Sequence, residues 1–509
     1  MKKWVHLRII HYVLRFTFYV LLCVPVCAAQ TWEDEVESDL IRGRIYRSGW
    51  ETAVTAEAEL CAQIAQHFKV APQKLAYYHG IYAFQQGDFQ EAQAQFRAFL
   101  STKPKADETS LFFDLAELWL GACAYKLDGK ALPKIPPKSV EETNRLRWKS
   151  ELGYLLAWLD INPSEGYEIC QESFTQAESQ NVDDLDIFRV HLGYTALRQG
   201  DLAQADKLFK AIDHRRPEYV DVYNEVKFFD GVVEPLDLKF YHPAILDHRA
   251  EYHFRKAAAQ GREEAEKGNL KGKYWLGVCG REIGGAHLEE ALQLLAEVAN
   301  AQGDAKLAML ASIQLGACLY LKGEKEQANE KWAQVNPASD AQIANELAET
   351  YMALQIEPET AANLYRSSRK QLRELPEYQS RRQRRRKAWR RTDAYKQYTW
   401  NLAFALFKAD QPSAAENELK KVYLPHEKKL LDSPNKKSPH WQILSLRRHL
   451  NLAQLARCYL DYTRYNEMYF YIYWENMLPK SDYYPETYQL FPCLKWLDLL
   501  KKYKPKVGG

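Results

Sequence analysis

Residues 80–96 read GIYAFQQGDFQEAQAQF, and residues 193–209 read GYTALRQGDLAQADKLF. In both copies a glycine is followed by an alanine, a Gly-Asp pair, a second alanine and a phenylalanine, at identical spacings. A third copy runs from Gly316 through Gly323 and Ala328 to Trp332. Small residues let two antiparallel helices pack closely, while the large apolar residue fills the space between them. The repeats therefore predict an all-α protein built from helix pairs.

These segments resemble the tetratricopeptide repeat, a 34-residue helix–turn–helix with the same order of small, glycine, small and aromatic positions. A proline follows each of the two best copies, at Pro104 and Pro217, where it ends the second helix. Weaker copies follow near Ala348, Ala403 and Ala456. The central region is similar to Sel1-like repeats, through the segments AAQG at 258–261, YWLG at 274–277 and AQGDA at 301–305. The resemblance implies a right-handed α-α superhelix (solenoid) of degenerate helix pairs over residues 71–478.

The repeats and their interruptions divide the chain into six parts. The stretch FFDGVVEPLDLKFYHP at 228–243 breaks the pattern and favours extended chain, as a hinge between two arms would. The predicted parts are a signal peptide at 1–29, an N-terminal array at 30–227, an irregular connector at 228–250, a central array at 251–365, a basic helical segment at 366–395, and a C-terminal array with a capping helix at 396–509.

The N-terminus has the pattern of a secretory signal peptide. Four basic residues precede an 11-residue apolar run, FTFYVLLCVPV at 16–26, and Cys27-Ala28-Ala29 offers small residues before a cleavage site near Gln30. We therefore predict a periplasmic or secreted protein. An uncleaved inner-membrane anchor is the alternative, although Arg15 would then lie inside the bilayer.

The cysteine positions indicate buried packing sites rather than a metal or redox site. Removing the signal leaves seven, and no Cys-x-x-Cys pattern occurs. Four of them stand two residues after a small residue, which indicates small buried side chains at one repeated position. These four, which we predict to be reduced and buried, are Cys123, Cys279, Cys318 and Cys458.

The common catalytic motifs are absent from the sequence. It has no G-x-S-x-G, H-E-x-x-H, phosphate-binding loop, G-x-G-x-x-G or acidic calcium loop. The Glu172-Ser173 pair lacks the glycine-rich neighbourhood of a lysozyme-like domain, and a metal site at His242 and His248 is a minor alternative. We expect no enzyme activity, cofactor or metal, with an unrecognised hydrolase as a remaining alternative.

Charge is concentrated in one segment. The whole chain has a net charge of only +2, which argues against a nucleic-acid partner, yet residues 380–391 read SRRQRRRKAWRR. This segment is either a solvated helix paired with acidic faces of the chain or a patch for anionic lipid or lipopolysaccharide. The predicted patch consists of Arg381, Arg382, Arg384, Arg385, Arg386, Lys387, Arg390 and Arg391.

Together these patterns favour a non-catalytic interaction scaffold that binds a protein or peptide partner. The alternative is a structural subunit of a cell-envelope assembly for polysaccharide or outer-membrane biogenesis. In the resembling families the first helix of each pair lines a concave groove. Mapped onto the matching copies, that rule predicts partner contacts at Tyr77, Phe84, Gln85, Tyr194, Arg198, Tyr320, Trp400, Phe407 and Lys408.

Overall fold

The structure, a computed structural model, describes most of the chain between residues 31 and 418. Within that range the gaps are 69–72, 103–109, 134–141, 183–184, 213–219, 222–238, 241–243, 381, 384–386, 412 and 416, and Arg447 is described as well. The predicted signal peptide, most of the connector, Pro104, Pro217 and the predicted capping helix lie outside the described residues.

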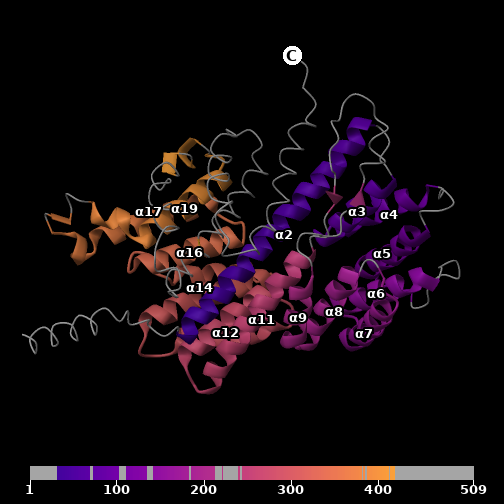
Figure 1. Cartoon of the computed structure of the whole chain (residues 1–509). Helices are drawn as coiled ribbons and strands as arrows, with labels where there is room; N and C mark the ends of the chain where they lie inside the picture. Colours follow the sequence, from indigo (N-terminus) through magenta and orange to yellow (C-terminus); the bar gives the residue numbers. More distant parts are fainter. Residues whose placement is uncertain are drawn as a thin grey trace, which may run out of the picture.

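The described chain is almost entirely helical, which confirms the predicted class (Figure 1). The helices of the first half are α2 (Trp32–Phe68), α3 (Gln73–Gln85), α4 (Phe89–Leu100), α5 (Ser110–Asp128), α6 (Glu142–Trp158), α7 (Pro163–Ser179), α8 (Leu185–Gln199) and α9 (Leu202–Ala211). Those of the second half are α11 (Ala244–Glu266), α12 (Leu270–Ile283), α13 (His287–Asn300), α14 (Ala305–Lys322), α15 (Lys325–Ala333), α16 (Ala341–Ala353), α17 (Pro358–Glu374) and α19 (Asp393–Lys408). Two short strands, β1 (Val220–Asp221) and β2 (Lys239–Phe240), pair antiparallel; β2 lies within the predicted connector and β1 shortly before it.

Successive helices pack as pairs, and the pairs turn where the sequence predicts. Gly87, Gly200 and Gly323 have φ angles of 82°, 86° and 93°, a left-handed conformation that favours glycine. In the first two copies the next residue caps the following helix: Asp88 accepts a hydrogen bond from the Glu91 backbone N–H, and Asp201 accepts one from Gln204. The Gly-Asp pair therefore both ends one helix and starts the next.

The first glycine of each copy lies at a helix crossing, as predicted. An added Cβ would stand 2.8 Å from the facing ring in the first copy, 2.7 Å in the second and 2.4 Å in the third. The glycine–aromatic pairs are Gly80 with Phe96, Gly193 with Phe209, and Gly316 with Trp332. All six residues are buried or in direct contact with a buried ring, so the repeated spacing encodes the core of each pair.

The helix α2 differs from the predicted repeat pattern. It is a single helix of 37 residues that packs along α11, more than 200 residues away in sequence, and crosses the middle of the molecule (Figure 1). A Cβ on Gly43 would lie 2.3 Å from Cε1 of Phe254, so the two helices are in close contact there. Asp39 binds His253 at 2.8 Å and Lys256 at 3.0 Å. The N-terminal segment is thus a brace on the second half rather than another helix pair.

The cysteines are packed as predicted in the described part of the chain. Cys123, Cys279 and Cys318 are free and fully buried, as is Cys170, while Cys458 lies outside the described residues. Burial raises the pKa of the Cys123 and Cys318 thiols to about 12.

We expect the four buried thiols to be unreactive in the folded protein, because the thiolate is the nucleophile and burial disfavours its formation. They are Cys123, Cys170, Cys279 and Cys318. A thiol reagent added to native protein at pH 8 should label none of them, and labelling should appear on unfolding. Mass spectrometry after non-reducing digestion would identify the labelled positions, and a disulfide between any two of them would contradict the packing interpretation.

Candidate functional site

Most of the predicted groove residues belong to the core instead. Tyr77, Phe84, Gln85, Tyr194, Trp400 and Phe407 are all at most 8% exposed, so the prediction that they face an open groove is wrong. Side chains of other helices cover two of them: Phe84 packs edge-on against Trp119 of α5, with ring centroids 5.1 Å apart, and Tyr194 stacks on His248 of α11 at 4.0 Å. Arg198, Tyr320 and Lys408 are partly exposed, and Arg198 binds Asp160 at 2.9 Å.

The candidates for metal or hydrolase chemistry named from the sequence do not form an open site: Ser173 is buried, and Glu172 beside it is exposed. His248 is fully buried, with Nε2 2.9 Å from the Tyr154 hydroxyl, and His242 lies outside the described residues. Ser150, His191 and Glu151 have the residue types of a nucleophile, base and acid, with Ser150 Oγ 2.9 Å from His191 Nδ1. Because all three are at most 2% exposed, this arrangement offers its hydroxyl to no substrate in this conformation.

The basic segment is not the continuous helix that the sequence predicts. The helix α17 ends at Glu374 because Pro376 disfavours helical geometry at Leu375, whose ψ is 138°. After it the chain forms two short 3₁₀ helices, Pro376–Tyr378 and Ala388–Arg391, and Lys387 between them has a φ of +50°.

Several basic side chains of this segment are nevertheless exposed. These are Arg382, Lys387 and Arg390. Trp389 is buried beside them, with the Arg373 guanidinium 5.5 Å from its ring centroid. Arg381, Arg384, Arg385 and Arg386 lie outside the described residues, as does the side chain of Arg391.

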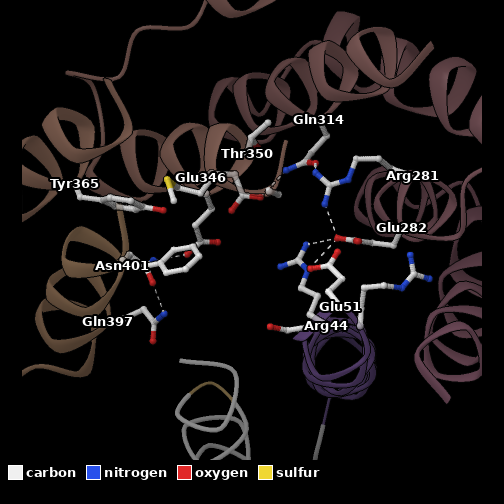
Figure 2. A pocket seen from close by; sticks show the side chains of 16 residues that line it. Arg44, Glu51, Arg281, Glu282, Gln314, Glu346, Thr350, Tyr365, Gln397 and Asn401 are labelled. Carbon is white, nitrogen blue, oxygen red and sulfur yellow. Dashed lines mark hydrogen bonds and ion pairs between the residues drawn. The ribbon is translucent and has the colours of Figure 1, made fainter. Parts of the chain in front are cut away.

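A cavity that the sequence did not predict lies between α2 and the helices α12, α14, α16, α17 and α19 (Figure 2). It has a volume of about 200 Å³ and a mainly polar and charged lining. The side chain of Arg44 enters from α2, while each of the other helices presents one face. The lining residues are Arg44, Arg47, Ser48, Glu51, Arg281, Glu282, Gln314, Glu346, Glu349, Thr350, Met352, Ala353, Tyr365, Gln397, Asn401 and Phe404.

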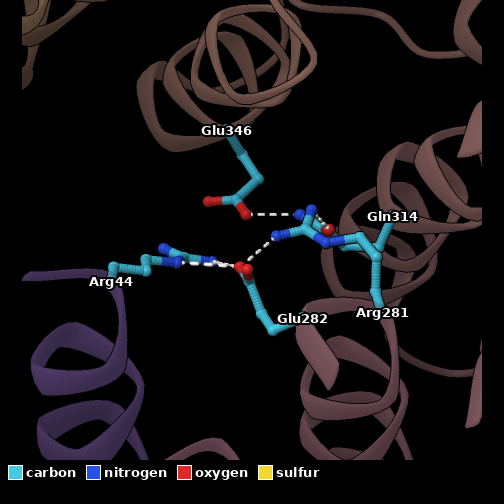
Figure 3. Close-up of polar contacts among 5 residues, drawn as sticks. All are labelled: Arg44, Arg281, Glu282, Gln314 and Glu346. Atoms are coloured by element: carbon cyan, nitrogen blue, oxygen red, sulfur yellow. Dashed lines mark hydrogen bonds and ion pairs between the residues drawn. The ribbon is translucent and has the colours of Figure 1, made fainter. Parts of the chain in front are cut away.

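One side of this cavity is closed by an ion-pair network centred on Glu282 (Figure 3). Arg44 of α2 donates from Nε and Nη2 to Glu282 Oε1, at 2.9 and 2.8 Å. Arg281 binds the same carboxylate and also donates to the Gln314 side-chain oxygen. The network therefore fixes α2 against α12 and α14.

Through Gln314 the network continues to two carboxylates of α16 that side-chain amides hold (Figure 3). Gln314 donates to Glu346 at 2.6 Å. Glu349 Oε1 accepts hydrogen bonds from Asn345 at 2.9 Å and from Asn401 at 2.8 Å. Since Glu346 and Glu349 are three residues apart on α16, their side chains share one face of that helix.

The pKa values of Glu282 and Glu346 are shifted in opposite directions. Burial by itself would raise the pKa of Glu282, but the guanidinium groups of Arg281 and Arg44 lower it to about 2. At Glu346, burial and the neighbouring charge of Glu349 raise the pKa to about 7, against the influence of Arg44, Arg281 and Arg447. Glu346 is thus partly protonated near neutral pH, while Glu282 is ionised.

Stability should therefore fall as the pH rises from 5 to 8. The pKa of Glu346 is higher in the folded state than its ordinary value, so its contribution is complete at low pH and is lost as the pH passes 7. Glu346→Gln removes this titration, and wild type should lose on the order of 1–3 kcal/mol more than the variant between pH 5 and 8. Urea unfolding of both proteins at the two pH values measures this; equal losses would contradict the assigned environment.

Buried amide side chains on successive helices are the sequence feature that could have indicated this cavity. Gln314 is 1% exposed in α14, whose sequence AKLAMLASIQLGACLYLK is otherwise apolar at its buried positions. Asn345 and Asn401 are likewise buried amides on α16 and α19. A lone buried polar residue needs hydrogen-bond partners, so such positions on successive first helices indicate a shared polar interior.

The described residues offer neither a membrane-spanning helix nor a metal-binding cluster. Among them, no helix is both long enough and apolar enough to cross a membrane. Nor do they contain a group of three or more His, Cys, Asp or Glu side chains that could hold a metal ion.

Comparison with known proteins adds little to this picture. No protein-family model matches the chain, and no curated protein does. The chain is similar to a solved structure of a monomeric mutant of IFIT1 with Gppp-AAAA, at 14% identity, over 70% of this chain and 89% of that one, with a TM-score of 0.19. That TM-score is too low to support an argument about ligand or function. The described chain is thus all-helical and repeat-like, with a polar cavity between α2 and the helices of its second half.

Proposed function

We propose that this protein is a non-catalytic, exported interaction scaffold of the tetratricopeptide-repeat type that binds a protein or peptide partner. The observation that carries the proposal is the lining of the cavity. Helices α12, α14, α16 and α19 each contribute polar side chains to it, although they belong to successive repeat units. Repeat arrays bind extended partners in this way, with each unit adding a few contacts to one continuous surface.

The cavity also favours binding over catalysis. Its side chains are mostly held by one another, as Glu282 is by two arginines and Glu349 by two asparagines. Such mutual hydrogen bonding positions groups rigidly for recognition. The resemblance to tetratricopeptide and Sel1-like repeats supports the same class of function.

Capture of a partner from the envelope fraction tests this proposal. Tagged mature protein would be cross-linked in cells and purified, as wild type and as Glu349→Ala. The control is Glu297→Ala on α13, whose exposed carboxylate lies outside the cavity. We expect the cavity variant to recover about tenfold less of a specific protein than the control, since losing contacts worth 1.4 kcal/mol weakens binding tenfold.

The result also separates the two functional classes. A stoichiometric complex that survives gel filtration would favour a structural subunit, whereas transient capture of peptides would favour an adaptor. Equal recovery by Glu349→Ala and wild type would contradict a role for this face.

The exposed basic residues lead to a separate prediction. Replacing Arg382, Lys387 and Arg390 by Gln should weaken binding to vesicles of anionic lipid, most clearly at low salt, because exposed charges are screened by ions. Folding should be nearly unaffected, since surface charge pairs contribute about 0–1 kcal/mol each. Vesicle sedimentation and thermal melting measure the two effects; unchanged sedimentation with a lowered melting temperature would assign the segment a structural role.

A further inference from the structure

The cavity has more acidic groups than its own arginines neutralise. Arg44 and Arg281 both bind Glu282. Arg47 points to Asp247, with 2.9 Å between Nε and Oδ1. Arg447, whose charge also acts on Glu346, pairs with Glu37.

Of the other lining carboxylates, Glu346 and Glu349 stand on one face of α16. Within the described residues, Glu346 and Glu349 form no ion pair and accept hydrogen bonds from side-chain amides alone. Burial disfavours the charged form of a carboxylate, and a cation in direct contact with it would offset that cost more strongly than neutral amide donors do.

A second observation points to a missing ligand at the same place. Thr350 lines the cavity next to Glu349 and is 2% exposed, yet its hydroxyl has no hydrogen-bond partner among the described residues. A helical threonine commonly donates to the carbonyl four residues earlier, and this one does not. An unsatisfied buried hydroxyl costs about 1–3 kcal/mol, so such groups normally have a partner.

We propose that this cavity binds an organic cation, a guanidinium or primary ammonium group, between the carboxylates of Glu346 and Glu349. The cation donates hydrogen bonds to both carboxylates and to the Thr350 hydroxyl, which a guanidinium can do with its fork of five N–H groups. The rings of Tyr365 and Phe404 lie in the same lining and can stabilise a positive charge. A volume of about 200 Å³ accommodates such a group with a short aliphatic stem.

The elevated pKa of Glu346 supports this assignment. Without a cation, burial and Glu349 keep Glu346 partly protonated near pH 7. A bound cation takes the place of that proton, so binding near neutral pH should release protons.

The cation can come from two sources that share this chemistry. One is an arginine or lysine side chain of the partner, in which case the inference rests on the proposed function and specifies how the partner is held. The other is a free small guanidine or amine. Methylguanidine and 1,4-diaminobutane serve as probes for the site itself, and arginine amide represents a partner side chain.

Calorimetric titration of the mature protein tests the site without requiring a partner. Methylguanidine should bind, and titrations at pH 7 in two buffers of different ionisation enthalpy should reveal the released protons. Methylurea, which is neutral and of nearly the same shape, should bind at least about tenfold more weakly. Glu349→Gln and Thr350→Val should each weaken methylguanidine binding, whereas the surface variant Glu290→Gln should not.

The outcomes distinguish this inference from the proposed function. Methylguanidine binding without any captured partner would support the site and assign it a small molecule. Tighter binding of arginine amide than of either free cation would assign it a partner side chain. Folded wild-type protein that binds no probe, or binds methylurea equally well, would overturn the inference even if a partner is captured.

Discussion

Gly316→Leu should destabilise the protein by about 3 kcal/mol or more, although leucine has a higher helix propensity than glycine. An added Cβ would lie 2.4 Å from Nε1 of Trp332, and that indole N–H donates to the Ile313 carbonyl at 3.1 Å. The longer side chain must therefore displace the ring and break a buried hydrogen bond. Urea unfolding of wild type and variant measures the difference.

Helix propensity alone would make Gly316→Leu stabilising, whereas overlap with Trp332 makes it destabilising, so the sign of the change distinguishes the two effects. Ala305→Leu adds the same side chain to an exposed position of the same helix and should change stability by less than about 0.5 kcal/mol. Gly316→Ala and Gly193→Leu should also destabilise, the second through Phe209 at 2.7 Å. If Gly316→Leu matched the Ala305→Leu control, the alignment of the repeats would be wrong.

Glu282→Gln should cost about 2–3 kcal/mol, because it leaves two arginines without their shared counter-charge. This loss of stability is smaller than that of a fully buried ion pair, because the Glu282 side chain is 19% exposed to solvent. The stabilisation from Glu282 is present above its ordinary pKa near 4.3 and is lost as the pH falls towards 2. The variant should therefore differ most from wild type at neutral pH and least in acid.

Glu290→Gln is the matched control for this substitution. It removes the carboxylate of the Arg262–Glu290 pair, which lies between α11 and α13 with both side chains well exposed. Exposed pairs contribute about 0–1 kcal/mol, so chemical denaturation should show little change. Equal losses in the two variants would mean that the network around Glu282 does not hold α2 in place.

The contacts within a helix pair could be predicted from sequence because both partners lie in one short segment. Gly80 and Phe96 are 16 residues apart, as are the corresponding residues of the other two copies, and the turn glycine fixes how the two helices face each other. The burial of Cys123, Cys279 and Cys318 followed from the same local rule.

Contacts between distant segments could not be predicted in this way. Whether Tyr194 faces solvent depends on His248 of α11, a helix that begins at Ala244, within the range predicted from sequence to be an irregular connector. The cavity combines Arg44 with Asn401, and no spacing in the sequence relates the two. In the basic segment, the run of charged residues suggests a helix, but Pro376 disfavours helical geometry at Leu375 and ends α17 there.

The packing of α2 against distant helices affects how this chain should fold and unfold. In a simple repeat array each unit contacts only its neighbours, so units can melt one after another from the ends. Here Lys271 forms an ion pair with Glu33, 238 residues away in sequence. Glu37 forms one with Arg447, 410 residues away. Such contacts raise the contact order, so the brace cannot dock until the chain beyond α12 has formed. Folding should consequently be slow but cooperative, and loss of the N-terminal helix should turn one sharp transition into several broad ones.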